Sequence, residues 1–408
     1  MENQLAVEKL PDILEIEVKF QPIVSVLQKS IIGLAGISLG ANINHDFITL
    51  KNLFTNAKTS DCEINLDRLI REKVISTFHE TYYDEEQILF INIHMNIIEK
   101  YIGSGSILEL MNRYNINPHN VILVIYENNI GDVDVIKKFI TTYRNNGFLT
   151  ALTMGSSLSN IDSLTYIQPD IIIIDEAITK NIEFNFYKQE VLKSLVNLSK
   201  KISAQVVVDG INNEEQALIS IELGADMLQG NYFGRYNDIN PRFLNTALTR
   251  VDHVASQYIN FKAEQIEFDQ LKHKHYDKIL SSTIQILSTL AEDEFDLSLN
   301  NIISKCDILE CAYVLNELGT QVSDTATHFK AVLVQRSLIF KPAKKGADHS
   351  LKKYYYFLKN MRLKKYVTDE YLSLASGNLC ITISEQFQGI NNKKYILCMD
   401  FNPAYINR

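Results

Sequence analysis

The sequence predicts an α/β barrel that is followed by a smaller α+β domain. Eight short runs rich in Ile and Val fall within the first 230 of the 408 residues, and stretches with helical periodicity separate most of them. Apolar strands that alternate with helices are typical of a parallel sheet covered on both faces, and eight such units favour a closed, TIM-barrel-like sheet. After about residue 240 the pattern changes to long helical stretches, and then to strands with one helix among them.

The predicted barrel strands are residues 15–24, 31–39, 88–94, 121–126, 149–154, 171–175, 204–209 and 226–229. Helical periodicity is clearest in residues 67–78, 133–143 and 192–202. The segment between the first two strands, residues 25–30, is too short for a crossover helix. These two strands are therefore expected to be antiparallel.

The second part of the chain begins with helices and ends with strands. Residues 241–305 contain no Gly and no Pro after Pro241, and a pair of helices over 254–271 and 276–290 is predicted to connect the two domains. The later strands are expected at residues 312–316, 321–324, 365–367, 379–384 and 395–401, with a helix at 349–361 that Asp348 caps. This arrangement favours an α+β domain of the PAS or Cache type. The predicted organisation is a barrel over 1–247, a helical connector over 248–305 and a sensor-like domain over 306–408.

Composition excludes several classes of protein. Apolar residues make up 46% of the chain and charged residues 22%, which is ordinary for a globular protein. Residues 1–250 carry 21 Lys and Arg against 31 Asp and Glu, so the first domain is acidic and is not expected to attract nucleic acid. No apolar run approaches the roughly 20 residues of a membrane span, and the N-terminus lacks a signal-peptide pattern. The five cysteines form no CxxC pair. We expect a cytoplasmic protein with reduced, buried thiols and no membrane contact.

A succession of short motifs crosses the predicted barrel. They are FQPIV at 20–24, PDIIIID at 169–175, VDGI at 208–211, ELGAD at 222–226 and QGNYFGR at 229–235. In this order and spacing they resemble the EAL domain, the bacterial phosphodiesterase domain that linearises cyclic di-GMP. The resemblance implies a barrel whose first strand pair is antiparallel, which agrees with the short connection deduced above.

The resemblance also implies a degenerate catalytic centre. The family's reaction uses two divalent cations held by carboxylates, but the corresponding positions carry other residues here. The positions of the lost ligands and of the catalytic lysine are Ala35, Val124, Thr153, Met154 and Ile173. An arginine that contacts the dinucleotide in the family is replaced by Leu39. Because apolar side chains cannot compensate the charge of a cation, we expect no magnesium or manganese in the barrel, no other cofactor and no hydrolysis.

Some polar residues of the motifs remain. A remnant of the family's site is expected at Asn92, Glu127, Asp175, Asp209 and Gln229. Nucleotide contacts are expected from Gln21, Phe233, Gly234 and Arg235. The leading hypothesis is a catalytically inactive signalling protein that acts through protein contacts, at a mouth made apolar by Ile37, Leu39 and Met154. A cyclic di-GMP receptor without catalysis is the first alternative, and an altered phosphodiesterase that uses Asn92 and Asp209 with one metal ion is the second.

The second domain carries no catalytic constellation. It resembles, more loosely, the C-terminal sensor that follows the EAL domain in some bacterial proteins. A small ligand is expected between its sheet and its helix, lined by Tyr356, Arg362, Tyr371, Ser384 and Asp400. The nine basic residues within 341–365 are interpreted as a solvated helix face. The amphipathic connector and the family resemblance predict a homodimer, and a partner signalling protein is expected but not identified.

Overall fold

The computed structural model describes residues 15–43, 46–57, 60–84, 86–93, 105–126, 132–155, 161–236, 242–328 and 340–403. The chain forms two compact units, Met1–Phe261 and Lys262–Arg408. The predicted connector, residues 248–305, does not form a unit of its own. Residues 248–261 belong to the first unit and residues 262–305 to the second.

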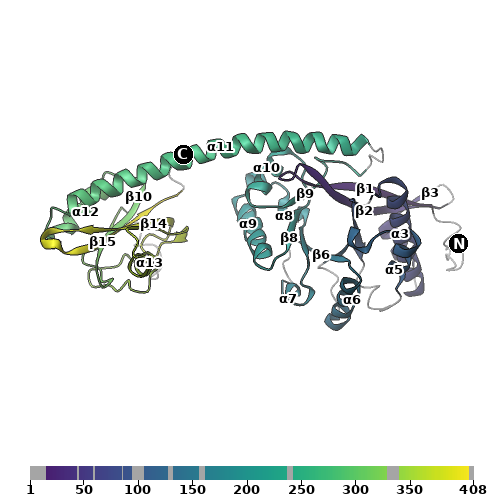
Figure 1. The fold of residues 1–408 in the computed structure, drawn as a ribbon, viewed down its shortest axis with the longest axis horizontal. Coiled ribbons are helices and arrows are strands. Elements are labelled where there is room, and N and C mark those ends of the chain that lie inside the picture. Colours follow the sequence, from purple (N-terminus) through teal and green to yellow (C-terminus); the bar gives the residue numbers. More distant parts are fainter. Residues whose placement is uncertain are drawn as a thin grey trace. The chain divides into compact units, whose positions relative to one another are not determined.

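The first unit is built on a closed sheet that contains all eight predicted strands (Figure 1). They are β1 (Glu15–Ser25), β2 (Ser30–Ile43), β4 (Ile88–Ile93), β5 (Val121–Tyr126), β6 (Leu149–Met154), β7 (Ile171–Ile174), β8 (Gln205–Val208) and β9 (Met227–Gln229). A further short strand, β3 (Asp46–Thr49), pairs only with β2. The predicted α/β barrel is confirmed.

Strand β1 runs against both of its neighbours. It pairs antiparallel with β2, where Ile23 faces Gly33, and antiparallel with β9, where Ile23 faces Gln229. The other seven barrel strands are parallel to one another. The predicted antiparallel first pair is thus confirmed, and the carboxyl ends of the seven parallel strands lie at one mouth of the barrel.

Helices cover the outside of the strands (Figure 1). They are α2 (Leu50–Asn56), α3 (Ser60–Thr81), α5 (Ser106–Arg113), α6 (Val133–Asn145), α7 (Ser163–Ile167), α8 (Glu176–Thr179), α9 (Phe186–Lys201), α10 (Glu214–Glu222) and the first part of α11 (Arg242–Leu287), with short 3-10 turns η2 (Pro118–Asn120) and η4 (Ile182–Phe184). Two apolar layers result from the alternation of the strands. On β5, Ile122 and Val124 join the barrel interior, whereas Leu123 and Ile125 join the layer beneath the helices.

Met154 belongs to the layer beneath the helices, where it is almost completely buried. The prediction that it contributes to an apolar mouth is wrong. The reason is the two-residue period of a strand: Thr153 points to the barrel interior, so its neighbour points outward.

The second unit begins within α11, which is one helix of 46 residues rather than the predicted pair. No Gly or Pro interrupts its sequence, so nothing breaks the hydrogen-bond ladder between the two predicted segments. The acidic break lies at η5 (Glu292–Glu294), and α12 (Phe295–Ile303) follows it.

An antiparallel sheet forms the centre of this unit, in the order β11-β10-β15-β14-β12, with β13 paired to β14. Its strands are β10 (Leu309–Asn316), β11 (Ala326–Thr327), β12 (Lys365–Val367), β13 (Tyr371–Leu372), β14 (Leu379–Gln388) and β15 (Lys394–Phe401). One face packs on α12 and on the second part of α11, where Tyr276 stacks on Phe401 with ring centroids 4.4 Å apart. The other face packs on α13 (Lys353–Met361) through residues such as Tyr313 and Leu358.

Two local predictions in this unit are wrong. The strand expected at 321–324 is reduced to an isolated bridge between Leu315 and Gln321, and the backbone N–H of Gln321 donates to the carbonyl of Ala347 (2.8 Å). The helix predicted from 349 starts at Lys353, and Asp348 does not cap it. Instead, Asp348 Oδ1 accepts a hydrogen bond from the backbone N–H of Ser350 (2.8 Å) in the preceding turn.

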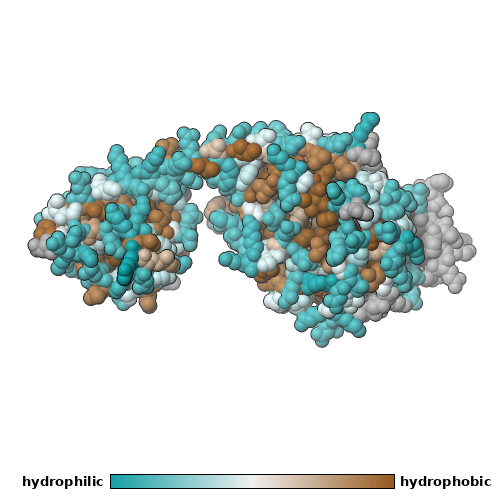
Figure 2. Space-filling view, in the orientation of Figure 1, coloured by the Kyte–Doolittle hydropathy of each residue, from teal (hydrophilic) through white to brown (hydrophobic). Residues whose placement is uncertain are grey.

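None of the helices among the described residues is long and apolar enough to cross a membrane. Figure 2 shows hydrophilic residues over much of the visible surface of each unit, with apolar patches between them.

Phe78 provides a test of the outer layer. It is fully buried on α3 and its ring lies 6.2 Å from that of Phe20 on β1. Phe78→Ala is expected to lower the free energy of unfolding of the first unit by about 3–5 kcal/mol through loss of burial and creation of a cavity. Phe184→Ala is the matched control, because Phe184 is 84% exposed, and it should change stability by less than about 0.5 kcal/mol. Urea unfolding followed by circular dichroism measures both, and equal losses would contradict this assignment of the core.

Candidate functional site

The barrel interior gathers four of the five positions at which the sequence predicted lost catalytic residues. Val124 lies directly opposite Asn92 of β4, and Thr153 lies directly opposite Ile173 of β7. Ala35 on β2 packs against the same interior cluster as Val124 and Ile173. The interior end of the parallel strands is therefore lined mainly by apolar side chains and one threonine.

Gln21 and Gln229 are tied together on adjacent strands. Gln229 Nε2 donates to Gln21 Oε1 (2.9 Å), and Gln21 Nε2 donates to the carbonyl of Gly234 (3.0 Å). Both side chains are buried. Gly234 itself lies so close to Pro22 that an added Cβ would meet the Pro22 Cδ at 2.8 Å. These residues hold the closing turn against β1, rather than presenting free groups to a ligand.

Two of the predicted remnant carboxylates follow β7 and β8. Asp209 accepts a hydrogen bond from the backbone N–H of Gly210 (2.7 Å), and burial, together with the charges of Asp175 and Glu176, raises the pKa of Asp209 to about 6. Asp175 caps α8, because its Oδ1 accepts from the backbone N–H of Ala177 (2.8 Å). The Asp209 carboxylate is thus poorly solvated, whereas the Asp175 carboxylate caps a helix.

Tyr126 and Tyr236, which were not predicted as site residues, complete the mouth. Tyr126 ends β5 and forms a hydrogen bond with Asn92, and burial and the Asp209 charge raise the pKa of Tyr126 to about 12. Burial and the same carboxylate raise the pKa of Tyr236, whose phenol bonds to Gln229. Both phenols therefore stay neutral around Asp209. The position of Tyr126 at the carboxyl end of a strand was the signal that could have identified it.

The described residues do not fit the two-metal centre that the family resemblance implies. They include no group of three or more His, Cys, Asp or Glu side chains placed to hold a metal ion. At the mouth, the charged oxygen donors near Asp209 are Asp175, which already caps α8, and Glu176. The other donors are the amide of Asn92 and neutral phenols, which supply no negative charge. Glu127, the remaining residue of the predicted remnant, lies outside the described residues.

A pocket of about 570 Å³ adjoins the mouth, lined by Leu39, Asn212, Asn231, Arg235 and Tyr236. Asn231 Nδ2 donates a hydrogen bond to Asn212 Oδ1 (3.1 Å). The Nδ2 of Asn212 donates to the carbonyl of Gly210 (2.9 Å). Arg235 is exposed. Of the four predicted nucleotide contacts, Arg235 alone lines this pocket. Phe233 is fully buried beneath the helices, so the expectation that it contacts a nucleotide is wrong.

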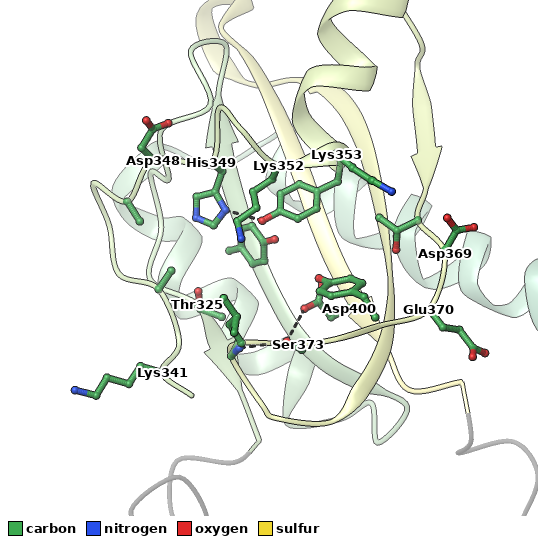
Figure 3. Close-up of a pocket in the computed structure, with 18 residues that line it drawn as sticks. Thr325, Lys341, Asp348, His349, Lys352, Lys353, Asp369, Glu370, Ser373 and Asp400 are labelled. Atoms are coloured by element: carbon green, nitrogen blue, oxygen red, sulfur yellow. Dashed lines mark hydrogen bonds between the residues drawn. The ribbon is translucent and has the colours of Figure 1, made fainter. Parts of the chain in front are cut away.

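The second unit contains a separate pocket of about 570 Å³ between its sheet and the segment before α13 (Figure 3). Tyr371 and Asp400 line it, as the sequence predicted, together with Tyr313, His349 and Tyr354. The structure thus brings together two of the five residues predicted for a ligand site in this unit.

The other three predicted residues lie elsewhere. Arg362 is exposed at the end of α13, in a left-handed conformation (φ 53°) that ends the helix. Tyr356 packs beside Phe357, with ring centroids 4.9 Å apart. Ser384 Oγ donates to the carbonyl of Tyr354 (3.0 Å) and so fastens α13 to β14. Helix α13 covers this part of the sheet, which is why these residues do not reach the pocket.

Asp400 is the most deeply buried charged group of this pocket, with 2% of its surface exposed. Thr382 Oγ1 donates to Asp400 Oδ1 (2.8 Å), and Ser373 Oγ donates to Oδ2 (3.3 Å). The phenol of Tyr371 lies 2.6 Å from the same Thr382 hydroxyl. Burial raises the pKa of Asp400 to about 6 despite these hydrogen bonds.

His349 lies across the pocket from this carboxylate in Figure 3. Its Nδ1 is 2.7 Å from the Tyr354 hydroxyl and its Nε2 is 2.9 Å from Gln321 Oε1. Burial and the nearby Lys352 ammonium lower the pKa of His349, so the imidazole is neutral near pH 7. His349 lies near the rings of Tyr313 and Tyr354. No sequence pattern predicted that His349 would line a pocket.

Comparison with known proteins supports the resemblance of the first unit to the EAL domain. A model of the EAL domain matches residues 7–236. The YkuI protein of Bacillus subtilis (strain 168), described as an uncharacterized EAL-domain containing protein, is 25% identical over 342 residues, or 79% of each chain. PdeA of Escherichia coli (strain K12), a probable cyclic di-GMP phosphodiesterase, is 30% identical over 150 residues, or 35% of this chain and 20% of PdeA.

The crystal structure of Bacillus subtilis YkuI in complex with cyclic di-GMP and calcium extends the comparison to both units. It covers 99% of this chain and 100% of that chain, with a TM-score of 0.76 and 20% sequence identity. At this identity the similarity shows a shared fold for the barrel and for the second unit.

Asp400→Asn is expected to stabilise the second unit at neutral pH. The pKa of Asp400 is about 6 in the fold against 3.8 in an unfolded chain, so the unfolded chain binds fewer protons between about pH 4 and 6. Stability therefore falls as pH rises through this window, by about 3 kcal/mol in total. The variant should exceed the parent by up to that amount at pH 7.5 and match it near pH 4. Urea unfolding at both pH values measures the difference, and a variant that is less stable at both would contradict the assignment.

Proposed function

This chain belongs to the EAL domain family, and we propose that it is a regulatory member which no longer hydrolyses cyclic di-GMP and acts by binding other molecules. One observation carries the proposal. The inward positions on β2, β5 and β7, where the family resemblance expects two metal ligands and a lysine, carry Ala35, Val124 and Ile173. These side chains pack against one another inside the barrel.

The chemistry of the remaining groups points the same way. Phosphodiester hydrolysis with two metal ions needs negative ligands that hold both ions and lower the pKa of a bound water. Asp209 is partly protonated near pH 6, and its neighbours Tyr126 and Tyr236 stay neutral. Asp175 and Glu176 lie near Asp209, but Asp175 is engaged in capping α8. Ala35, Val124 and Ile173 add no charge that would hold a second ion.

An exposed aromatic cluster favours action through protein contacts. Phe184, Phe186 and Tyr187 lie at the start of α9, after the mouth strand β7, and are 84%, 63% and 81% exposed. Aromatic side chains are enriched at protein interfaces, since they bury a large area at a small cost in conformational entropy. Association between two copies of the chain is part of this proposal, and light scattering of the full chain at micromolar concentration tests it.

A cyclic di-GMP receptor is the second candidate. The pocket at the barrel mouth favours it, because the exposed guanidinium of Arg235 lies beside the amides of Asn212 and Asn231. A guanidinium can form paired hydrogen bonds with a phosphate, and amides can bond to a base edge. The crystal structure of YkuI holds cyclic di-GMP, which adds weight to this candidate.

Hydrolysis of cyclic di-GMP is the first test. The full chain is incubated with the dinucleotide and either Mg²⁺ or Mn²⁺, and products are separated by chromatography. We expect no product above the protein-free control, because the mouth lacks the charge to hold two cations. Product that forms with the parent and disappears in Asp209→Ala would contradict the proposal and favour an altered phosphodiesterase.

Calorimetric titration with cyclic di-GMP separates the two binding hypotheses. If the barrel serves only protein contacts, we expect no binding up to about 100 µM, which corresponds to roughly −5.5 kcal/mol. Arg362→Ala is the control for Arg235→Ala, since Arg362 is an exposed arginine of the second unit. Binding that Arg235→Ala abolishes and Arg362→Ala preserves would replace the leading hypothesis with the receptor.

A further inference from the structure

We propose that the pocket of the second unit binds a free α-amino acid, with Asp400 receiving its ammonium group and Lys352 its carboxylate. The proposal is independent of the function of the barrel.

The pocket has the size and lining of a small-molecule site. Its volume of about 570 Å³ lies in the range typical of ligand cavities. It opens on the face of the sheet that carries Thr382 and Asp400, which are cross-strand partners on β14 and β15. Helix α13 covers the neighbouring part of this face. The pocket therefore lies beside the N-terminal end of α13, where Lys353 and Tyr354 line it.

Asp400 provides a buried negative charge with spare hydrogen-bonding capacity. A carboxylate offers about four acceptor positions, and here two hydroxyls, of Thr382 and Ser373, donate to it, with the Cys380 thiol also close enough to bond. Among the described residues, no basic side chain forms an ion pair with Asp400. Because an isolated buried charge is costly, a ligand that brings an ammonium group to this carboxylate would gain a strong, charge-assisted contact.

Aromatic rings form the walls around this charge. Tyr313, Tyr354 and Tyr371 all line the pocket, and they come from β10, α13 and β13. The faces of such rings attract cations. The imidazole of His349 is neutral and already bonded on both nitrogens, so it does not compete as a cation.

Lys352 supplies the opposite charge. Figure 3 shows its side chain reaching into the pocket beside His349, and this lysine is one of the charges that lower the pKa of His349. The remaining charged side chains of the lining point away from the centre of the pocket in this view. They are Lys341, Asp348, Lys353, Asp369 and Glu370.

The two charges together select the class of ligand. Lys352 is exposed at the rim of the pocket, so its ammonium is available to a ligand. A simple amine would satisfy Asp400 without using Lys352, and a simple carboxylate would meet the negative charge of Asp400. A molecule with one ammonium and one carboxylate satisfies both. The apolar side of Leu374 and Ala375, which also line the pocket, is suited to a side chain that is not charged.

Calorimetric titration of the full chain with each of the twenty standard amino acids at pH 7.5 tests the proposal. We expect at least one uncharged member to bind with a dissociation constant below 1 mM. Asp400→Asn should weaken that binding by at least tenfold, and Lys352→Gln by a similar factor. The methyl ester of the same amino acid lacks the carboxylate, so it should bind the parent more weakly and should not respond to Lys352→Gln.

Glu310→Gln is the matched control. Glu310 is a second buried carboxylate of this sheet, but it lies outside the pocket lining, and its two oxygens accept from Asn378 (2.9 Å) and Asn402 (2.8 Å). Its replacement should leave the affinity within twofold. Circular dichroism verifies that each variant is folded. No binding of any of the twenty amino acids at 10 mM, or binding that Asp400→Asn leaves unchanged, would overturn the proposal.

Discussion

The arrangement of the first unit depends on the inverted strand β1. Because β1 pairs antiparallel with both β2 and β9, it closes the sheet while the seven other strands keep a common direction. All the side chains that follow those seven strands therefore gather at one mouth. The buried bonds from Gln21 to Gln229 and to Gly234 fasten this closure from the inside. The same contact explains why two residues of the expected nucleotide-binding set are structural here.

Buried carboxylates occur in both units, but their surroundings differ. Asp209 lies among neutral phenols at the barrel mouth, with Asp175 and Glu176 near enough to oppose its ionisation. Asp400 lies among hydroxyls and aromatic rings, and a lysine reaches into the same pocket. Each has a pKa of about 6 because burial outweighs its hydrogen bonds. The first environment repels further negative charge and lacks a cation, whereas the second combines both signs of charge and suits a zwitterion.

A protein of this kind would separate its two tasks by unit. On the proposed function, the first unit would serve recognition through exposed groups such as Phe184, Phe186 and Tyr187. The second unit would serve a small molecule through its own pocket of about 570 Å³. One fold can carry different functions, because the strands fix the fold while the residues at their ends determine the chemistry.

The sequence by itself determined the barrel, because strand period, helix period and connection length are local properties. The eight strands and the antiparallel first pair were predicted from it. The direction of single side chains could not be predicted in the same way. Met154 and Thr153 are neighbours on one strand, and only the alternation of the strand sends their side chains to opposite faces. The contents of the two pockets were decided by tertiary structure. Tyr126 and Asp209 come from parts of the chain far apart in sequence, and His349 and Asp400 line one pocket although they lie 51 residues apart. Such meetings depend on which elements pack together, and no local pattern records them.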